Sequence, residues 1–184
     1  MTEKHLSSQF DSELNSVSTR VMELGGLVES QIQHAIHALA HFSLESVAQV
    51  DALEQRVNTM EVEIDHELST IIARRQPTAR DLRLLIAFSK ATANLERMGD
   101  EAHKMARMVQ AIIESGSARQ LPTIDLRVAA DLASGLLRKA LDALTDASAT
   151  YGEGFGYDIR GDLVHVEKLA KGAQRRHLAK KGKR

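Results

Sequence analysis

Apolar residues along most of this chain recur at alternating spacings of three and four, which is the period of one face of a long α-helix. Three such stripes follow one another, covering residues 8–41, 44–75 and 79–115. Short breaks separate them, so consecutive helices are expected to turn back on each other. The pattern therefore predicts an all-α fold built on an antiparallel three-helix bundle.

The residues at the breaks support these limits. Gln76 precedes Pro77, a position that disfavours the helical conformation, so the second helix is expected to end there. Thr78 is a suitable N-cap for the third helix, and Asp81 three residues later predicts a capping box. Gly116 stands where a helix commonly ends in the left-handed conformation.

A fourth stripe follows Pro122, runs to about Asp146 and is rich in small side chains. Without further helices its apolar face is unburied, which predicts self-association or docking on the first bundle. Two glycines, Gly25 and Gly26, interrupt the first stripe, and we interpret them as a point of close helix approach. After Thr150 the chain is rich in glycine and then basic, and we expect it to be disordered.

Composition narrows the function classes. There is no Cys, which excludes disulfides, thiolate metal sites and cysteine nucleophiles. The sequence shows no phosphate-binding loop, nucleophile elbow or zinc-protease motif, so we expect no enzyme activity. The net charge is −1, but residues 168–184 carry eight basic and no acidic residues, which leaves a net charge of −9 on the remaining residues.

No apolar run is long enough to span a membrane and no signal peptide is seen, so a cytoplasmic protein is expected. With no recognisable nucleic-acid-binding fold, no nucleic-acid partner is expected either.

Two acids in the third stripe, Glu96 and Asp100, lie one helical turn apart on the same face. They sit beside the apolar stripe rather than opposite it, and like charges stacked in this way repel each other. The mid-helix Gly99 between them suggests that room is kept for something, because such a glycine costs about 1 kcal/mol. A bound cation is one explanation, and ion pairs with Arg97 or Lys104 are the alternative.

The second stripe carries a matching polar row. Its members follow spacings of four, three and four: Glu54, Asn58, Glu61 and Asp65. If the second and third helices are antiparallel, these oxygens face Glu96 and Asp100. Oxygen-rich clusters suit hard cations, and mixed carboxylate–histidine sites suit iron, manganese or zinc.

Several motifs in order resemble the PhoU family of phosphate-signalling proteins. They are Gln9–Leu14, Val21–Glu29, Met60–Asp65, Ile71–Arg83 and Leu95–Asp100. The resemblance covers about residues 5–146. It implies a fold of two similar three-helix bundles, of which this chain shows the first, over 1–117, and one helix of the second, over 118–150. Residues 151–184 form a tail that departs from the family, as in a truncated or frame-altered ending.

The resemblance also implies a function. Such proteins are cytoplasmic negative regulators of phosphate uptake and of the phosphate-starvation response. They act as adaptors between the phosphate-specific ABC transporter ATPase and a phosphate-sensing histidine kinase. This chain is accordingly expected to associate with the membrane only through these partners. It is also expected to be a homodimer. Glu96 and Asp100 match the family's metal-binding motif, and Glu61 and Asp65 match acids of the preceding helix. The implied metal is divalent or ferric: iron, manganese, magnesium or zinc.

Two alternatives remain. One is a carboxylate bundle that stores or oxidises iron. Such a bundle requires Glu-x-x-His pairs on two helices. The residue three positions before His103 is Asp100 rather than Glu, so the sequence does not match that pattern there. The other is a purely structural interaction bundle.

Overall fold

The computed structural model describes the backbone of residues 2–116 and 123–149, and the side chains of residues 8–116 and 131–146. The chain divides into two units, Met1–Ser148 and Ala149–Arg184. The first unit contains all the described side chains. The tail expected to be disordered, residues 151–184, lies outside the described residues.

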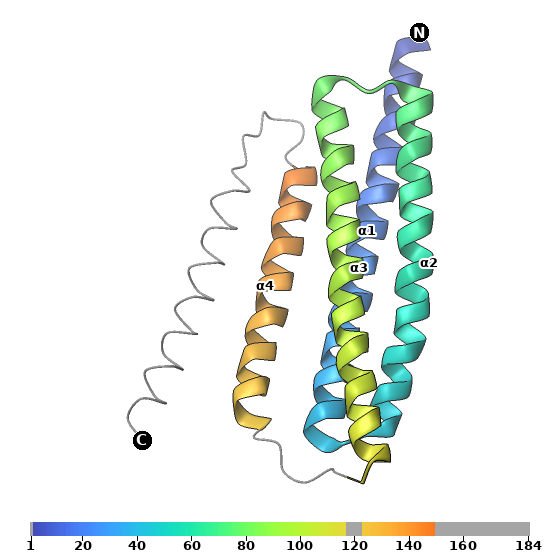
Figure 1. Ribbon diagram of the computed structural model, residues 1–184. Helices are drawn as coiled ribbons and strands as arrows, with labels where there is room; N and C mark the ends of the chain where they lie inside the picture. Colours follow the sequence, from blue (N-terminus) through green and yellow to red (C-terminus); the bar gives the residue numbers. More distant parts are fainter. Residues whose placement is uncertain (1, 117–122, 150–184) are drawn as a thin grey trace. The chain divides into compact units, whose positions relative to one another are not determined.

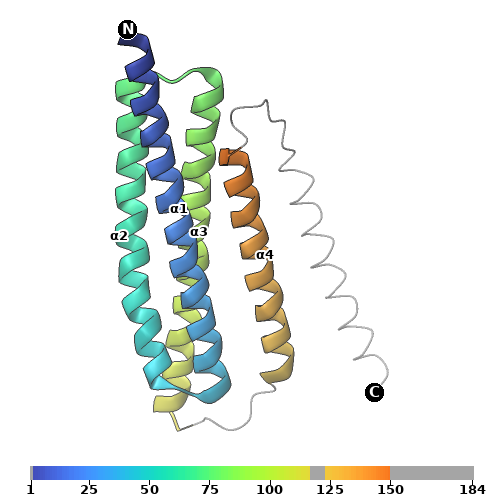
Figure 2. The same cartoon turned by 180° about the vertical axis from the view of Figure 1, so that it is seen from behind.

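Three long helices pack against each other in all three pairings: α1 (Thr2–His41), α2 (Leu44–Arg75) and α3 (Ala79–Glu114). They run side by side and alternate in direction (Figures 1 and 2). A fourth helix, α4, spans Thr123–Ala149. The all-α fold predicted from the apolar stripes is therefore confirmed for the described residues. None of these four helices is long and apolar enough to cross a membrane.

The turns between the helices are short and locally specified. Phe42 adopts a left-handed conformation with φ 50°, and Ser43 then caps α2 by accepting a hydrogen bond from the backbone N–H of Ser46, at 3.2 Å. Gln76 is also left-handed and ends α2 directly before Pro77. Gly116 (φ 67°) follows the end of α3, as predicted.

One local prediction was wrong. Thr78 is the N-cap of α3, but its side chain makes no hydrogen bond to the helix backbone. Its hydroxyl donates instead to Asp81 Oδ2, at 2.9 Å. A carboxylate is a charged and therefore stronger acceptor, so the hydroxyl acts as a donor and the reciprocal capping box does not form.

The core contains the predicted stripes of α1 and α2 and most of the predicted α3 stripe, whose buried members are Leu84, Phe88, Leu95, Ala102 and Val109. A second row beside it is buried as well: Leu85, Thr92, Gly99 and Ala106. Met98 and Met105, which also belong to the predicted stripe, are only half-buried. Small side chains on the second row allow the helices to approach closely, which brings the face that bears Glu96 nearer to the core.

Helix α4 contacts α1 at Gly25, the first of the two mid-helix glycines of α1. A Cβ on Gly25 would lie 2.6 Å from both methyl carbons of Leu141, whereas one on Gly26 would meet nothing within 4 Å. Arg138 pairs with Glu29 in the same region. The expected close helix approach is therefore found at Gly25 and not at Gly26.

Candidate functional site

A polar cluster interrupts the apolar interior of the bundle. Gln31 of α1 is 0% exposed, Thr92 of α3 is 2% exposed and Glu54 of α2 is 7% exposed. A buried carboxylate is costly unless hydrogen bonds replace its water. Gln31 Nε2 donates to Glu54 Oε2 at 2.6 Å, and Asn58 Nδ2 donates to Glu54 Oε1 at 3.2 Å. Each oxygen of this carboxylate is therefore held by an amide.

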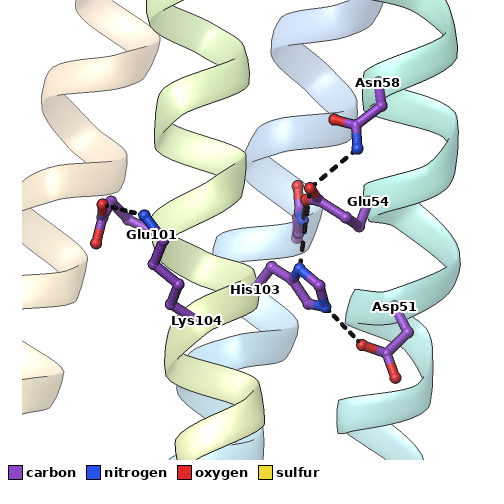
Figure 3. A network of polar contacts seen from close by, with 7 residues as sticks. Asp51, Glu54, Asn58, Glu101, His103 and Lys104 are labelled. Atoms are coloured by element: carbon purple, nitrogen blue, oxygen red, sulfur yellow. Dashed lines mark hydrogen bonds and ion pairs between the residues drawn. The ribbon is translucent and has the colours of Figure 1, made fainter.

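His103 connects α3 to this cluster. Its Nε2 lies 3.0 Å from Asp51 Oδ1, and its Nδ1 lies 3.9 Å from Glu54 Oε1. Because a carboxylate only accepts hydrogen bonds, the Nε2 proton donates to Asp51. Figure 3 shows the His103 ring pointing from α3 toward Asp51 and Glu54 on α2.

The predicted acids of α3 border this cluster. Glu96 and Asp100 are both half-buried. Burial raises the pKa of Glu96 above its ordinary 4.5, and the charges of Asp100, Glu61 and Glu54 raise it further. Arg97 acts in the opposite direction. Carboxylates of α2 and α3 thus act on one another across the helix pair, and we call Glu54, Glu61, Glu96 and Asp100 the acidic seam.

The structure brings together three of the four acids that the sequence singled out. Glu61 is half-buried and acts electrostatically on Glu96, as Asp100 does. Asp65 is exposed and is not among the described acids that raise the Glu96 pKa. Glu54 also takes part. The polar row of α2 predicted that it faces Glu96 and Asp100, but the metal ligands named from the sequence did not include it.

Ion pairing does not account for the seam. Lys104 pairs with Glu101 at 2.9 Å, on the side of α3 away from the Glu54 cluster (Figure 3). Within the part of the chain that the structure describes, none of Glu61, Glu96 and Asp100 forms an ion pair with Lys or Arg. Like charges therefore lie close together, and Arg97 and Lys104 act on them only from beyond ion-pair distance.

Gly99 makes room for Gln31. A Cβ added to Gly99 would lie 2.8 Å from Gln31 Oε1 and 3.4 Å from Val57 Cγ1. The space expected beside this glycine is thus occupied by the buried amide. Gln31 Oε1 and Thr92 Oγ1 have no hydrogen-bond partner among the described residues, and Thr92 stands one turn before Glu96. Two buried polar atoms in the interior of the bundle, one of them beside Gly99, are therefore unsatisfied.

The donor set fits a hard cation in its chemistry, because carboxylate and amide oxygens are the ligands that Mg²⁺, Mn²⁺ and Ca²⁺ prefer. The side chains do not yet converge on one point. Among the described residues, no group of three or more His, Asp or Glu side chains is arranged to hold a metal ion. Glu61, Glu96 and Asp100, with Glu54 behind them, are the residues that could hold one after side-chain rotation.

A second polar surface lies in an open groove of about 730 Å³ between α1 and α2. Its charges are largely satisfied. Arg20 bridges Glu63 and Glu67, with 3.0 Å to the latter, and Arg75 binds Glu13 through two hydrogen bonds of 2.6 and 2.9 Å. These pairs tie α1 to α2 and indicate no particular ligand.

Comparison with known proteins gives a consistent result. The family description "PhoU domain" matches residues 21–109. A phosphate-specific transport system accessory protein PhoU homolog from Burkholderia sp is 45% identical over 153 residues, which is 82% of this chain and 65% of that protein. The accessory protein PhoU of Escherichia coli (strain K12) is 48% identical over 104 residues, 56% of this chain and 43% of that protein. This chain thus spans less than two thirds of the length of these curated relatives.

A solved structure is similar over most of the chain. The crystal structure of PhoU from Pseudomonas aeruginosa has a TM-score of 0.77 and 32% sequence identity. The match covers 93% of this chain and 78% of that one.

Proposed function

Because this chain belongs to the PhoU family, we propose that it is a cytoplasmic negative regulator of phosphate uptake and of the phosphate-starvation response. The observation that carries this proposal is the similarity to phosphate-transport accessory proteins along the whole described bundle. The role is regulatory rather than enzymatic.

The proposed partners are the ATPase of the phosphate-specific ABC transporter and a phosphate-sensing histidine kinase, with this chain as a homodimeric adaptor between them. The names of the relatives, which associate them with the phosphate-specific transport system, support the first partner. Association with the membrane would then occur through these partners.

A gene deletion tests the regulatory role. In phosphate-rich medium, we expect a clean deletion to raise secreted phosphatase activity, and a plasmid copy encoding this 184-residue chain to restore repression. An empty plasmid is the control. Unchanged phosphatase activity in the deletion strain would refute the regulatory role. Derepression that the plasmid copy does not correct would show that this chain alone is insufficient.

As a second function we propose that the acidic seam binds a metal ion through Glu61, Glu96 and Asp100, with Asp65 at the exposed end of the same row. The raised pKa of Glu96, together with the lack of Lys or Arg ion pairs at these three acids in the described chain, supports the proposal. A bound cation would neutralise the repulsion and link α2 to α3. Magnesium and manganese suit this oxygen-rich set best, and iron or zinc remain within the class.

Calorimetric titration of the full chain with Mn²⁺ tests this site. We expect one class of sites that is lost in the double variant Glu96→Ala/Asp100→Ala. Equal stoichiometry in the double variant and the unaltered chain would reject these ligands.

A further inference from the structure

We propose that His37 and His41, at the carboxy-terminal end of α1, together bind a divalent transition-metal ion. We call these two residues the histidine pair. Imidazole nitrogen is a preferred ligand of Zn²⁺, Ni²⁺ and Cu²⁺, whereas the oxygen-rich acidic seam suits harder cations. The histidine pair belongs to α1 and the seam to α2 and α3, so this inference does not depend on metal binding at the seam.

The first argument is the spacing of the histidine pair. Residues four apart lie one above the other on the same helix face, and the zinc-protease helix presents its two histidines to one ion at this spacing. The rings of His37 and His41 lie side by side, with 4.4 Å between their centroids and 41° between their planes. Both residues are exposed, so a hydrated ion can reach them. Residues 38–40 lack the glutamate that serves that motif as a base, so the pair is a binding site and not a catalytic one.

The second argument is the contact that orients His37. Its Nδ1 lies 2.8 Å from the hydroxyl oxygen of Ser46 on α2, and Ser46 is 6% exposed. When this hydroxyl accepts the Nδ1 proton, the lone pair is on Nε2, where it is available to a metal ion. Histidines that bind metals commonly donate their other ring nitrogen to a fixed acceptor in this way. Ser46 is therefore a positioning residue for the histidine pair.

The third argument is the fixed backbone beneath the histidine pair. Ala38, directly after His37, is fully buried, and Val47, directly after Ser46, is 3% exposed. Both belong to the same core cluster. The backbone N–H of Ser43 also donates to the carbonyl of Ala38, at 3.2 Å. The contact between His37 and Ser46 thus joins two helix ends that the core holds in place, and an ion bound there should stabilise the folded chain.

A third histidine on this helix, His34, lies three residues before His37 and half a heptad further from the turn. It is seven residues from His41, which is about 10 Å along the helix axis, so one ion cannot take all three rings. The ring contact favours His37 with His41. Among the described residues, no group of three or more His, Asp or Glu is arranged to hold a metal ion, so water completes the coordination of an ion bound by two histidines.

Calorimetric titration of the full, untagged chain with Ni²⁺ tests the inference. We expect His37→Gln and His41→Gln each to lose one Ni²⁺ site per chain, and Ser46→Ala to weaken that site about tenfold. The matched control is His66→Gln, because His66 is an exposed histidine with no other histidine within four residues. This control should bind as the unaltered chain does. The electron paramagnetic resonance spectrum of bound Cu²⁺ should show two imidazole nitrogens, and one in either variant of the pair.

The outcomes separate this site from the acidic seam. The double variant Glu96→Ala/Asp100→Ala should keep the Ni²⁺ site, and loss of the site in that variant would overturn the inference. Unchanged binding in His37→Gln or His41→Gln would also overturn it, as would loss of the site in His34→Gln but not in His41→Gln. Normal binding by Ser46→Ala would overturn the positioning role of Ser46. Because both histidines of the pair are exposed, their variants should keep the far-UV circular dichroism of the unaltered chain.

Discussion

Replacing Gly99 by alanine is the most direct test of the packing inside the bundle. The added Cβ would lie 2.8 Å from Gln31 Oε1, closer than such atoms approach in real structures, and 3.4 Å from Val57 Cγ1. Since Val57 is fully buried, the amide of Gln31 must move instead. Movement of that amide strains or breaks its 2.6 Å hydrogen bond to Glu54.

The magnitude follows from three contributions to the free energy of unfolding. Overpacking costs about 1–3 kcal/mol. Loss of a hydrogen bond to a charged group costs about 1.5–3 kcal/mol. Alanine offsets these losses by about 1 kcal/mol of helix propensity. We therefore expect Gly99→Ala to be less stable than the unaltered protein by about 1.5–5 kcal/mol if Gln31 loses its hydrogen bond to Glu54, and by about 0–2 kcal/mol if that bond is kept.

The assay is urea unfolding followed by far-UV circular dichroism, with Gly26→Ala as the control. Gly26 lies in a helix, and a Cβ added there would have nothing within 4 Å, so alanine at this position is expected to stabilise by up to about 1 kcal/mol. The difference between the two variants isolates the effect of the surroundings of Gly99. Equal stabilisation by both substitutions would refute the reasoning, because it would mean that Gln31 yields at no cost.

Three further predictions concern other parts of the described chain. Burial and neighbouring charges raise the pKa of Glu96 in the folded state, so the folded protein keeps this proton to a higher pH than the unfolded chain does. The free energy of unfolding therefore falls as the pH rises from 4.5 through the folded pKa. In urea titrations across that range, Glu96→Gln should abolish this loss, and an unchanged pH profile would contradict the prediction. Hydrogen bonding to Arg75 lowers the pKa of Glu13, so the pair stabilises the fold above pH 4.5 and this stabilisation is lost as the pH falls through the lowered pKa. Arg75→Lys, which cannot bind in the same bidentate way, should lower the urea unfolding midpoint at neutral pH and leave it unchanged in acid. Gly25→Ala should displace Leu141 and accelerate amide hydrogen exchange in α4, and unchanged exchange would argue against that contact.

The limits of the helices were predictable because their signals are local. The bounds of α2, Leu44–Arg75, match the prediction, since Pro77 and the short break after His41 act on neighbouring residues only. The core of α3 was predictable in part. Most of the predicted stripe is buried, but the close three-helix packing also buries a second row with the small residues Gly99 and Ala106, which the apolar pattern did not indicate.

The acidic seam was predictable in part for the same reason. Spacing along one helix places Glu96 beside Asp100, and antiparallel packing places Glu61 near them. The role of Glu54 depends on Gln31, which is 23 residues away on another helix and which looks like an ordinary polar residue in the sequence. Burial of that amide is a tertiary property, and no periodicity within a single helix reveals it.

The two-residue turn at Phe42 and Ser43 has a consequence for how the chain acquires its structure. Helices joined so closely form contacts that are near in sequence, which favours rapid folding. The hairpin of α1 and α2 already contains both Gln31 and Glu54. During synthesis from the amino terminus, we expect Glu54 to find its amide partner before the part of α3 that carries Glu96 and Asp100 has left the ribosome.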